Sequence, residues 1–144
     1  MKMTELCDLS ISDFCSADRY IALAKNYPMV NTGRYHHGLI YTIKGTETYN
    51  FGDIKIKAEP NTIAYLPKGG EYKITFEGEE SVVITLELEF CDNVSIKPFV
   101  IRLSENNALQ AMFLKACYMK IMQKFFLVLS QIIQQKIFHQ LHIP

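Results

Sequence analysis

The stretch Thr32–Tyr72 constrains the fold of this chain most, because it alternates short apolar segments with tight turns. Leu39–Ile43 is apolar and β-branched and ends at Lys44-Gly45, and Thr46–Phe51 alternates polar and aromatic residues up to Gly52-Asp53. Two further short segments follow the same pattern before a Pro-Lys-Gly-Gly turn. Turn signals at this spacing, with period-2 patterning between them, predict an all-β sandwich or barrel.

Length and charge narrow the class of protein. A chain of 144 residues, 49% of them hydrophobic, is long enough for one domain with a real core. Lys and Arg number 15 and so do Asp and Glu, so the chain lacks the basic excess that DNA binding normally requires. The N-terminus lacks the apolar run of a signal peptide, and the longest apolar run, Phe125–Leu129, is too short to span a membrane.

The cysteines indicate the redox environment. Cys7, Cys15, Cys91 and Cys117 form no C-x-x-C pair. In a chain of this size without an export signal, we expect free thiols and a cytoplasmic location.

The flanks of the central stretch extend the β pattern. We expect Met1–Asp18 to be an irregular lead-in that forms an arm or one short strand, and Arg19–Ala24 to be a strand. Glu71–Phe76 reads as a strand, Glu77–Glu80 as a charged hairpin turn, and Ser81–Phe90 as the most regular strand of the chain.

After Leu103 the hydrophobic period changes from two to that of a helix. Ser104 is a good N-cap, and no Gly or Pro follows it before Pro144. Two apolar stripes out of step predict one kinked helix or two amphipathic helices. We therefore expect a β-barrel at 1–103 and a helical segment at 104–144. The helical segment carries more apolar surface than one contact needs, which favours a homodimer interface. The residues expected there are Phe125, Phe126, Leu129, Ile132 and Ile133.

The phrases LIYTIKGTETYNFGD and EPNTIAYLPKGGEY resemble the two signature segments of the cupin fold. More narrowly, they are similar to the N-terminal sensing and dimerisation domain of AraC-type transcription regulators. The resemblance implies a cupin-like jelly-roll β-barrel followed by helices. It also implies a small-molecule effector, with a sugar as one candidate, and DNA binding through a helix-turn-helix domain that this chain lacks. The sequence leaves open whether the chain is a stand-alone sensor or part of a longer regulator.

The metal ligands of cupin enzymes are broken in this sequence. Such enzymes need His-x-His, then a Glu, and a last His after the second turn. His36 and His37 are adjacent, so strand alternation sends them to opposite faces. Gly38 or Ile40 stands where the Glu would be, and Tyr72 stands at the place of the last His. We therefore expect no metal, no cofactor and no enzymatic activity.

Five residues are candidate ligand contacts on the strength of this resemblance: Arg34, His36, Tyr72, Thr85 and Glu87. Arg34 and His36 precede the first signature strand, where an exposed turn is the alternative. Thr85 and Glu87 lie on the polar face of Ser81–Phe90. The pattern alone favours that face as a solvated surface over an apolar interior.

The sequence thus predicts a ligand-sensing and dimerisation domain of an AraC-type regulator. Two alternatives remain at this point: a stand-alone cupin enzyme of isomerase or dioxygenase type, and a cupin that serves only for oligomerisation.

Overall fold

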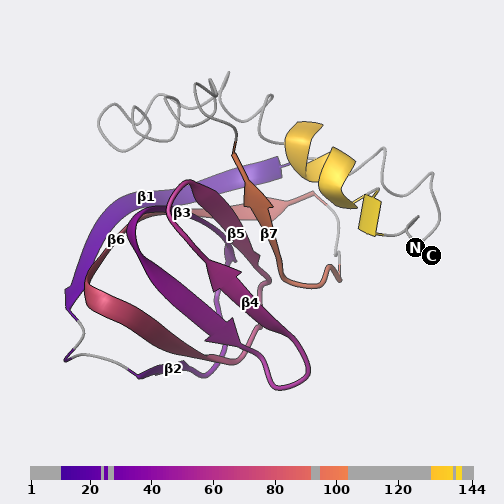
Figure 1. Cartoon of the computed structure of the whole chain (residues 1–144). Coiled ribbons are helices and arrows are strands. Elements are labelled where there is room, and N and C mark those ends of the chain that lie inside the picture. Colours follow the sequence, from indigo (N-terminus) through magenta and orange to yellow (C-terminus); the bar gives the residue numbers. More distant parts are fainter. Residues whose placement is uncertain are drawn as a thin grey trace.

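A single antiparallel sheet forms the body of the molecule. The computed structural model describes residues 11–23, 25, 28–91, 95–103, 131–137 and 139–140. The strands are β1 (Ile11–Leu23), β2 (Met29–Asn31), β3 (His37–Asn50), β4 (Lys55–Ala58), β5 (Thr62–Leu66), β6 (Tyr72–Phe90) and β7 (Phe99–Arg102). Their order is β1-β6-β3-β5-β7, with β2 added along β6 and β4 along β3. Figure 1 shows the sheet curled on itself into a half-barrel.

The curl arises in the two longest strands, β3 and β6. One half of β3 pairs with the C-terminal half of β6, from His37 opposite Leu88 onward, and the other half pairs with its N-terminal half. The register shifts on both sides of Lys44, which marks a β-bulge. A bulge bends its strand and increases the local twist. The two halves of the sheet can therefore face each other across a hollow.

Two hydrophobic clusters cover the two faces of the sheet. The inner cluster takes residues from both halves of β3, so it lies in the hollow of the curl: Ile40, Tyr49, Ala58, Ala64, Leu66, Tyr72 and Val83. A buried carboxylate, Glu47, also faces this side and accepts hydrogen bonds from the hydroxyls of Tyr49 and Ser81. The outer cluster takes the alternate residues of the same strands, among them Leu39, Tyr65, Ile84, Leu86 and Leu88.

A short helix packs on the outer cluster. Residues 131–137 and 139–140 are helical and lie beyond β7 in Figure 1. Ile133 and Ile137 are one turn apart and both are buried in the outer cluster, while Ile132 packs partly against it. No helix among the described residues is long and apolar enough to cross a membrane.

The mainly β prediction is confirmed, but two local predictions, the turns at Lys44-Gly45 and at Glu77–Glu80, are wrong. Residues from Ile11 to Asp18 are the first half of β1, which agrees with the alternative of a short strand in the lead-in. Lys44-Gly45 and Glu77–Glu80 are irregularities inside continuous strands and do not end them. Apart from residues 131–137 and 139–140, the helices expected at 104–144 lie outside the described residues.

Candidate ligand-binding site

A nearly buried arginine organises one end of the hollow. The Arg34 guanidinium donates to the Tyr72 hydroxyl from Nη1 (2.8 Å) and to Glu87 Oε1 from Nη2 (3.2 Å). Its Nε donates to the carbonyl oxygen of His36 (3.2 Å). The Arg34 side chain is 9% exposed. Each of its three nitrogens therefore has a partner inside the protein.

The backbone fixes Arg34 before its side chain makes any contact. The backbone N–H of Arg34 donates to the carbonyl of Gly70 (3.3 Å), and the backbone carbonyl of Arg34 accepts from the N–H of Gly69 (2.8 Å). The loop before β3 is thus tied to the turn before β6. Gly38 lies opposite Glu87 in the ladder, and a Cβ on it would lie 2.6 Å from Arg34 Nη2. Glycine at position 38 therefore makes the room in which the guanidinium lies.

We expect Gly38→Ala to displace the Arg34 guanidinium and to destabilise the chain by about 1–3 kcal/mol, the usual cost of overpacking a filled site. Urea denaturation measures this change in the free energy of unfolding. The clash disappears when Arg34 is shortened, so in an Arg34→Ala background the same glycine substitution should cost much less. Equal costs in the two backgrounds would contradict this account.

A second polar cluster adjoins the first. The Nδ1–H of His36 donates to Glu89 Oε1 (2.7 Å), and Lys68 Nζ donates to Glu89 Oε2 (3.1 Å). The hydrogen bond from His36 is the main reason that the pKa of Glu89 lies below its usual value. Cys15 Sγ lies 3.5 Å from the same Nδ1, in a stretch of β1 where a register shift interrupts the pairing with β6.

This cluster is poorly suited to nucleophilic catalysis. A Cys-His-acid relay needs the thiol and the carboxylate on different ring nitrogens. Here Cys15 and Glu89 both approach Nδ1 of His36. Burial, followed by the charges of nearby carboxylates, raises the pKa of Cys15, which disfavours the thiolate. The geometry favours binding over covalent chemistry.

The two adjacent histidines serve different parts of the molecule. His37 is buried, and its ring packs against Tyr65 and Phe90, which belong to the outer cluster. Burial lowers the pKa of His37 to about 4. His36 alone lies at the Arg34 site. Among the described residues, no three His, Cys, Asp or Glu side chains form a group that could hold a metal ion.

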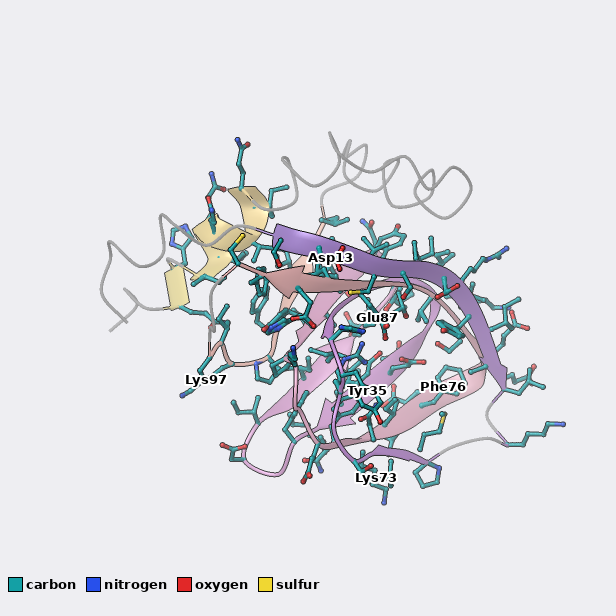
Figure 2. The ribbon with its side chains drawn as sticks, turned by 180° about the vertical axis from the view of Figure 1, so that it is seen from behind. Asp13, Tyr35, Lys73, Phe76, Glu87 and Lys97 are labelled. Carbon is teal, nitrogen blue, oxygen red and sulfur yellow. The ribbon has the colours of Figure 1, made fainter. Side chains whose placement is uncertain are left out.

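An open pocket of about 340 Å³ lies over these groups. Its lining residues are Asn31, Gly33, Arg34, Tyr35, His36 and Glu87. Figure 2 shows Tyr35 and Glu87 on the same face of the molecule.

The structure brings four of the five predicted contact residues together. Arg34, His36 and Glu87 line the pocket, and Tyr72 supports Arg34 from the inner cluster. Thr85 lies on the same face of β6 as Glu87, is half-buried and does not line the pocket. This polar face is half-buried, so it is less solvated than the pattern alone favours.

The residues predicted for a dimer interface have mixed positions. Ile133 is 2% exposed and belongs to the core of the single chain, and Ile132 is partly buried beside it. Phe125, Phe126 and Leu129 lie outside the described residues.

Sequence reasoning missed several members of the site. Tyr35 lies in a loop and Asn31 ends the short strand β2, so no periodic pattern distinguishes either residue. The sequence indicates only a turn at Lys68, although the side chain of Lys68 donates a hydrogen bond to Glu89. The two-residue spacing of Glu87 and Glu89 on a half-buried strand was the signal that could have placed Glu89 here.

Comparison with known proteins gives a likeness of fold. No family model and no curated protein matches the chain. Among solved structures, ToxT from Vibrio cholerae with a bound unsaturated fatty acid matches with a TM-score of 0.53 at 7% identity, over 89% of this chain and 56% of that one.

Two further structures are similar. A lysine-to-alanine variant of apo ToxT matches with a TM-score of 0.50 at 10% identity, over 81% of this chain and 53% of that one. Protein NMB1881 from Neisseria meningitidis matches with a TM-score of 0.42 at 12% identity, over 54% of this chain and 81% of its own. The chain thus spans little more than half the length of ToxT.

Proposed function

We propose that this chain is the effector-binding domain of an AraC-type transcription regulator, built on a cupin-like jelly roll. ToxT is a regulator of that family, and its likeness to this chain extends over most of the residues here. The ToxT structure holds an unsaturated fatty acid, which supports a small molecule as the effector of a protein with this fold.

The observation that carries the proposal is the pocket over Arg34. Partly buried polar groups at its base are held in fixed positions by Tyr72, Gly38 and the turn before β6. A concave site with a few convergent, pre-positioned polar groups is the usual form of a small-molecule site. A cupin that serves only for oligomerisation has no need of such a pocket, and the Cys15–His36 pair beside it is poorly arranged for nucleophilic catalysis.

The regulatory mechanism that we propose is thermodynamic linkage. An effector shifts the regulator only by its differential affinity for two arrangements of the protein. The pocket joins the loop before β3 to β6, and the hydroxyl of Ser16 on β1 donates to Glu87 Oε2 (3.3 Å). Binding at Glu87 would therefore act directly on the edge strand β1. We propose that a different domain makes the DNA contacts, since this chain carries no net charge.

A thermal-shift screen of small molecules against the purified chain tests the proposal. A true effector at a hundred times its Kd stabilises the folded state by about 2.7 kcal/mol, which raises Tm by several degrees. We expect this rise to change strongly in Arg34→Met, because the substitution removes the group that positions Tyr72 and Glu87. Arg102→Met is the matched control, because Arg102 forms an exposed ion pair with Glu59 away from the pocket. Equal change in both variants, or hits that are indifferent to Arg34→Met, would count against the site.

We also propose a homodimer formed by the helical segment. Because Ile133 is buried in the chain's own core, Phe126 is the better position for a test. We expect Phe126→Lys to convert a dimer into a folded monomer in sedimentation velocity at micromolar concentration. A wild-type monomer under these conditions would refute the interface.

A further inference from the structure

A ligand in the pocket can reach the carboxylate of Glu87 more readily than the guanidinium of Arg34. Three of the five N–H groups of Arg34 donate hydrogen bonds inside the protein, and the side chain is only 9% exposed. Glu87 is 35% exposed, and its two oxygens receive one bond each, from Arg34 and from Ser16. A carboxylate has about four acceptor sites, so Glu87 retains acceptor capacity toward the pocket.

The surroundings of Glu87 are acidic. Asp13 stands opposite Glu89 in the pairing of β1 with β6, and Asp18 stands opposite Thr85. Directly opposed residues share a face, so both aspartates project on the side of Glu87, and both are exposed. Figure 2 shows Asp13, Glu87 and Tyr35 on one side of the molecule.

Charges on this face do not balance. Four carboxylates, Asp13, Asp18, Glu87 and Glu89, face this side, whereas the cations Arg34 and Lys68 and the imidazole of His36 pair only with Glu87 and Glu89. The chain as a whole carries no net charge, so this negative excess is local. After burial, the charges of Asp18 and Glu87 help to raise the pKa of Tyr20 on β1, which is consistent with a negative potential here.

Aromatic surface borders the acid. Tyr35 lines the pocket and is 88% exposed, which is unusual for a large ring. A cation held near Glu87 could rest against the face of such a ring, since the ring quadrupole attracts positive charge.

We propose that the pocket binds a small organic ammonium ion, whose N–H groups donate to Glu87 and whose hydrocarbon body lies against Tyr35. This inference rests on the proposed effector-binding function and names its ligand class. A carboxylate ligand, such as the fatty acid seen in ToxT, would meet Glu87 at the surface. It would have only the two remaining N–H groups of Arg34, on a side chain that is 9% exposed, whereas an ammonium ion meets the more exposed Glu87. We therefore expect a ligand of the opposite charge to the fatty acid of the ToxT structure.

Three ligands of one shape and different charge test the inference: 2-phenylethylamine, 2-phenylethanol and phenylacetate. Titrations of the chain are followed by amide chemical shifts in NMR spectra. We expect the amine to bind at least about tenfold more tightly than the alcohol, with phenylacetate the weakest, as one ion pair in a partly desolvated pocket would give. Shift changes should centre on the pocket residues, from Asn31 to His36 and at Glu87.

Two substitutions locate the amine. Glu87→Gln should weaken its binding more than about tenfold, whereas Tyr35→Ala should weaken it about two- to fivefold. Tyr35→Ala removes an exposed ring, so it also tests the site if Glu87→Gln fails to fold. The control is Glu77→Gln, because Glu77 is an exposed acid paired with Lys57 and does not line the pocket. It should leave the affinity unchanged.

The outcomes separate this inference from the proposed function. Binding of the alcohol within about threefold of the amine, tighter binding of phenylacetate, or no shift with any of the three at millimolar concentration would overturn the ammonium inference. The effector-binding proposal would survive each of these results as long as the thermal-shift screen finds a ligand that depends on Arg34. If that screen also fails, both fall.

Discussion

Gly45→Ala is expected to destabilise the folded chain by about 4 kcal/mol, enough to unfold a large share of a marginally stable domain. Gly45 has φ +81°, which an L side chain adopts only with strain. A Cβ there would also lie 2.6 Å from the carbonyl oxygen of Glu80 and 3.0 Å from the Cα of Ser81. These are backbone atoms of β6, so relief requires a shift of the strand pairing itself.

Gly52→Ala is the matched control. Gly52 also has a positive φ, +97°, but a Cβ there meets nothing within 4 Å. Only the conformational strain remains, which we expect to cost about 1–2 kcal/mol. Urea denaturation of both variants measures the difference. Similar costs would show that the close approach of β3 and β6 at Gly45 contributes little, and that the curl is not fixed there.

Gly45 also shows why the sequence predicted the strands better than their connections. A glycine that interrupts an alternating pattern marks either a turn or a bulge, and the local pattern is the same in both cases. At Gly45 the chain continues, because residues on both sides pair with the same strand, β6. Only long-range pairing decides between the two, and no local window contains that information.

The pattern leaves the polar first half of β1 open between an arm and a strand for a related reason. Its serines and aspartates have low strand propensity, yet they pair with β6 at the edge of the sheet, where one side of each residue remains in solvent. The orientation of β6 was ambiguous because both of its faces are covered. Leu86 and Leu88 pack in the outer cluster, while Glu87 faces the half-barrel.

The candidate site could be predicted in part. Arg34 and Glu87 were identified by resemblance, but their mutual contact depends on a glycine at position 38 that was considered only as a missing metal ligand. Tyr35 contributes to the pocket because it is exposed, and exposure of a single loop residue leaves no pattern in a sequence.

The second large effect on the stability of the chain is expected from the protonation state of His37. The backbone N–H of Lys68 donates to His37 Nδ1 (3.3 Å), so this nitrogen is an acceptor and the proton lies on Nε2. The Tyr65 hydroxyl lies 2.8 Å from the same Nδ1, so the two groups share its single lone pair. A neutral imidazole accepts from the N–H of Lys68, whereas an imidazolium would lose that bond and place a charge inside the core. Burial is accordingly the main cause of the lowered pKa of His37, about 4.

The stability of the chain is therefore expected to fall by about 2–3 kcal/mol between pH 7 and pH 4.5 on account of His37 alone. The unfolded chain binds a proton at this residue near its usual pKa of 6.5, and the folded chain does so only near 4. Within that window the unfolded state holds more protons, so protons favour unfolding as pH falls. Above about 6.5 the contribution of His37 is fully present, and below about 4 it is lost.

Urea denaturation of His37→Asn at both pH values isolates this contribution. Asparagine keeps an acceptor near the position of Nδ1 but does not titrate, so the variant should lose less stability than the wild type between pH 7 and pH 4.5. The control is His139→Asn, which makes the same substitution at an exposed histidine. The carboxylates, including Glu89, titrate in every variant, so their effect cancels when the pH-dependent losses are compared. An equal loss in His37→Asn and wild type would mean that His37 is not buried as a neutral acceptor, and the link from Tyr65 to the turn at Lys68 would have to be abandoned.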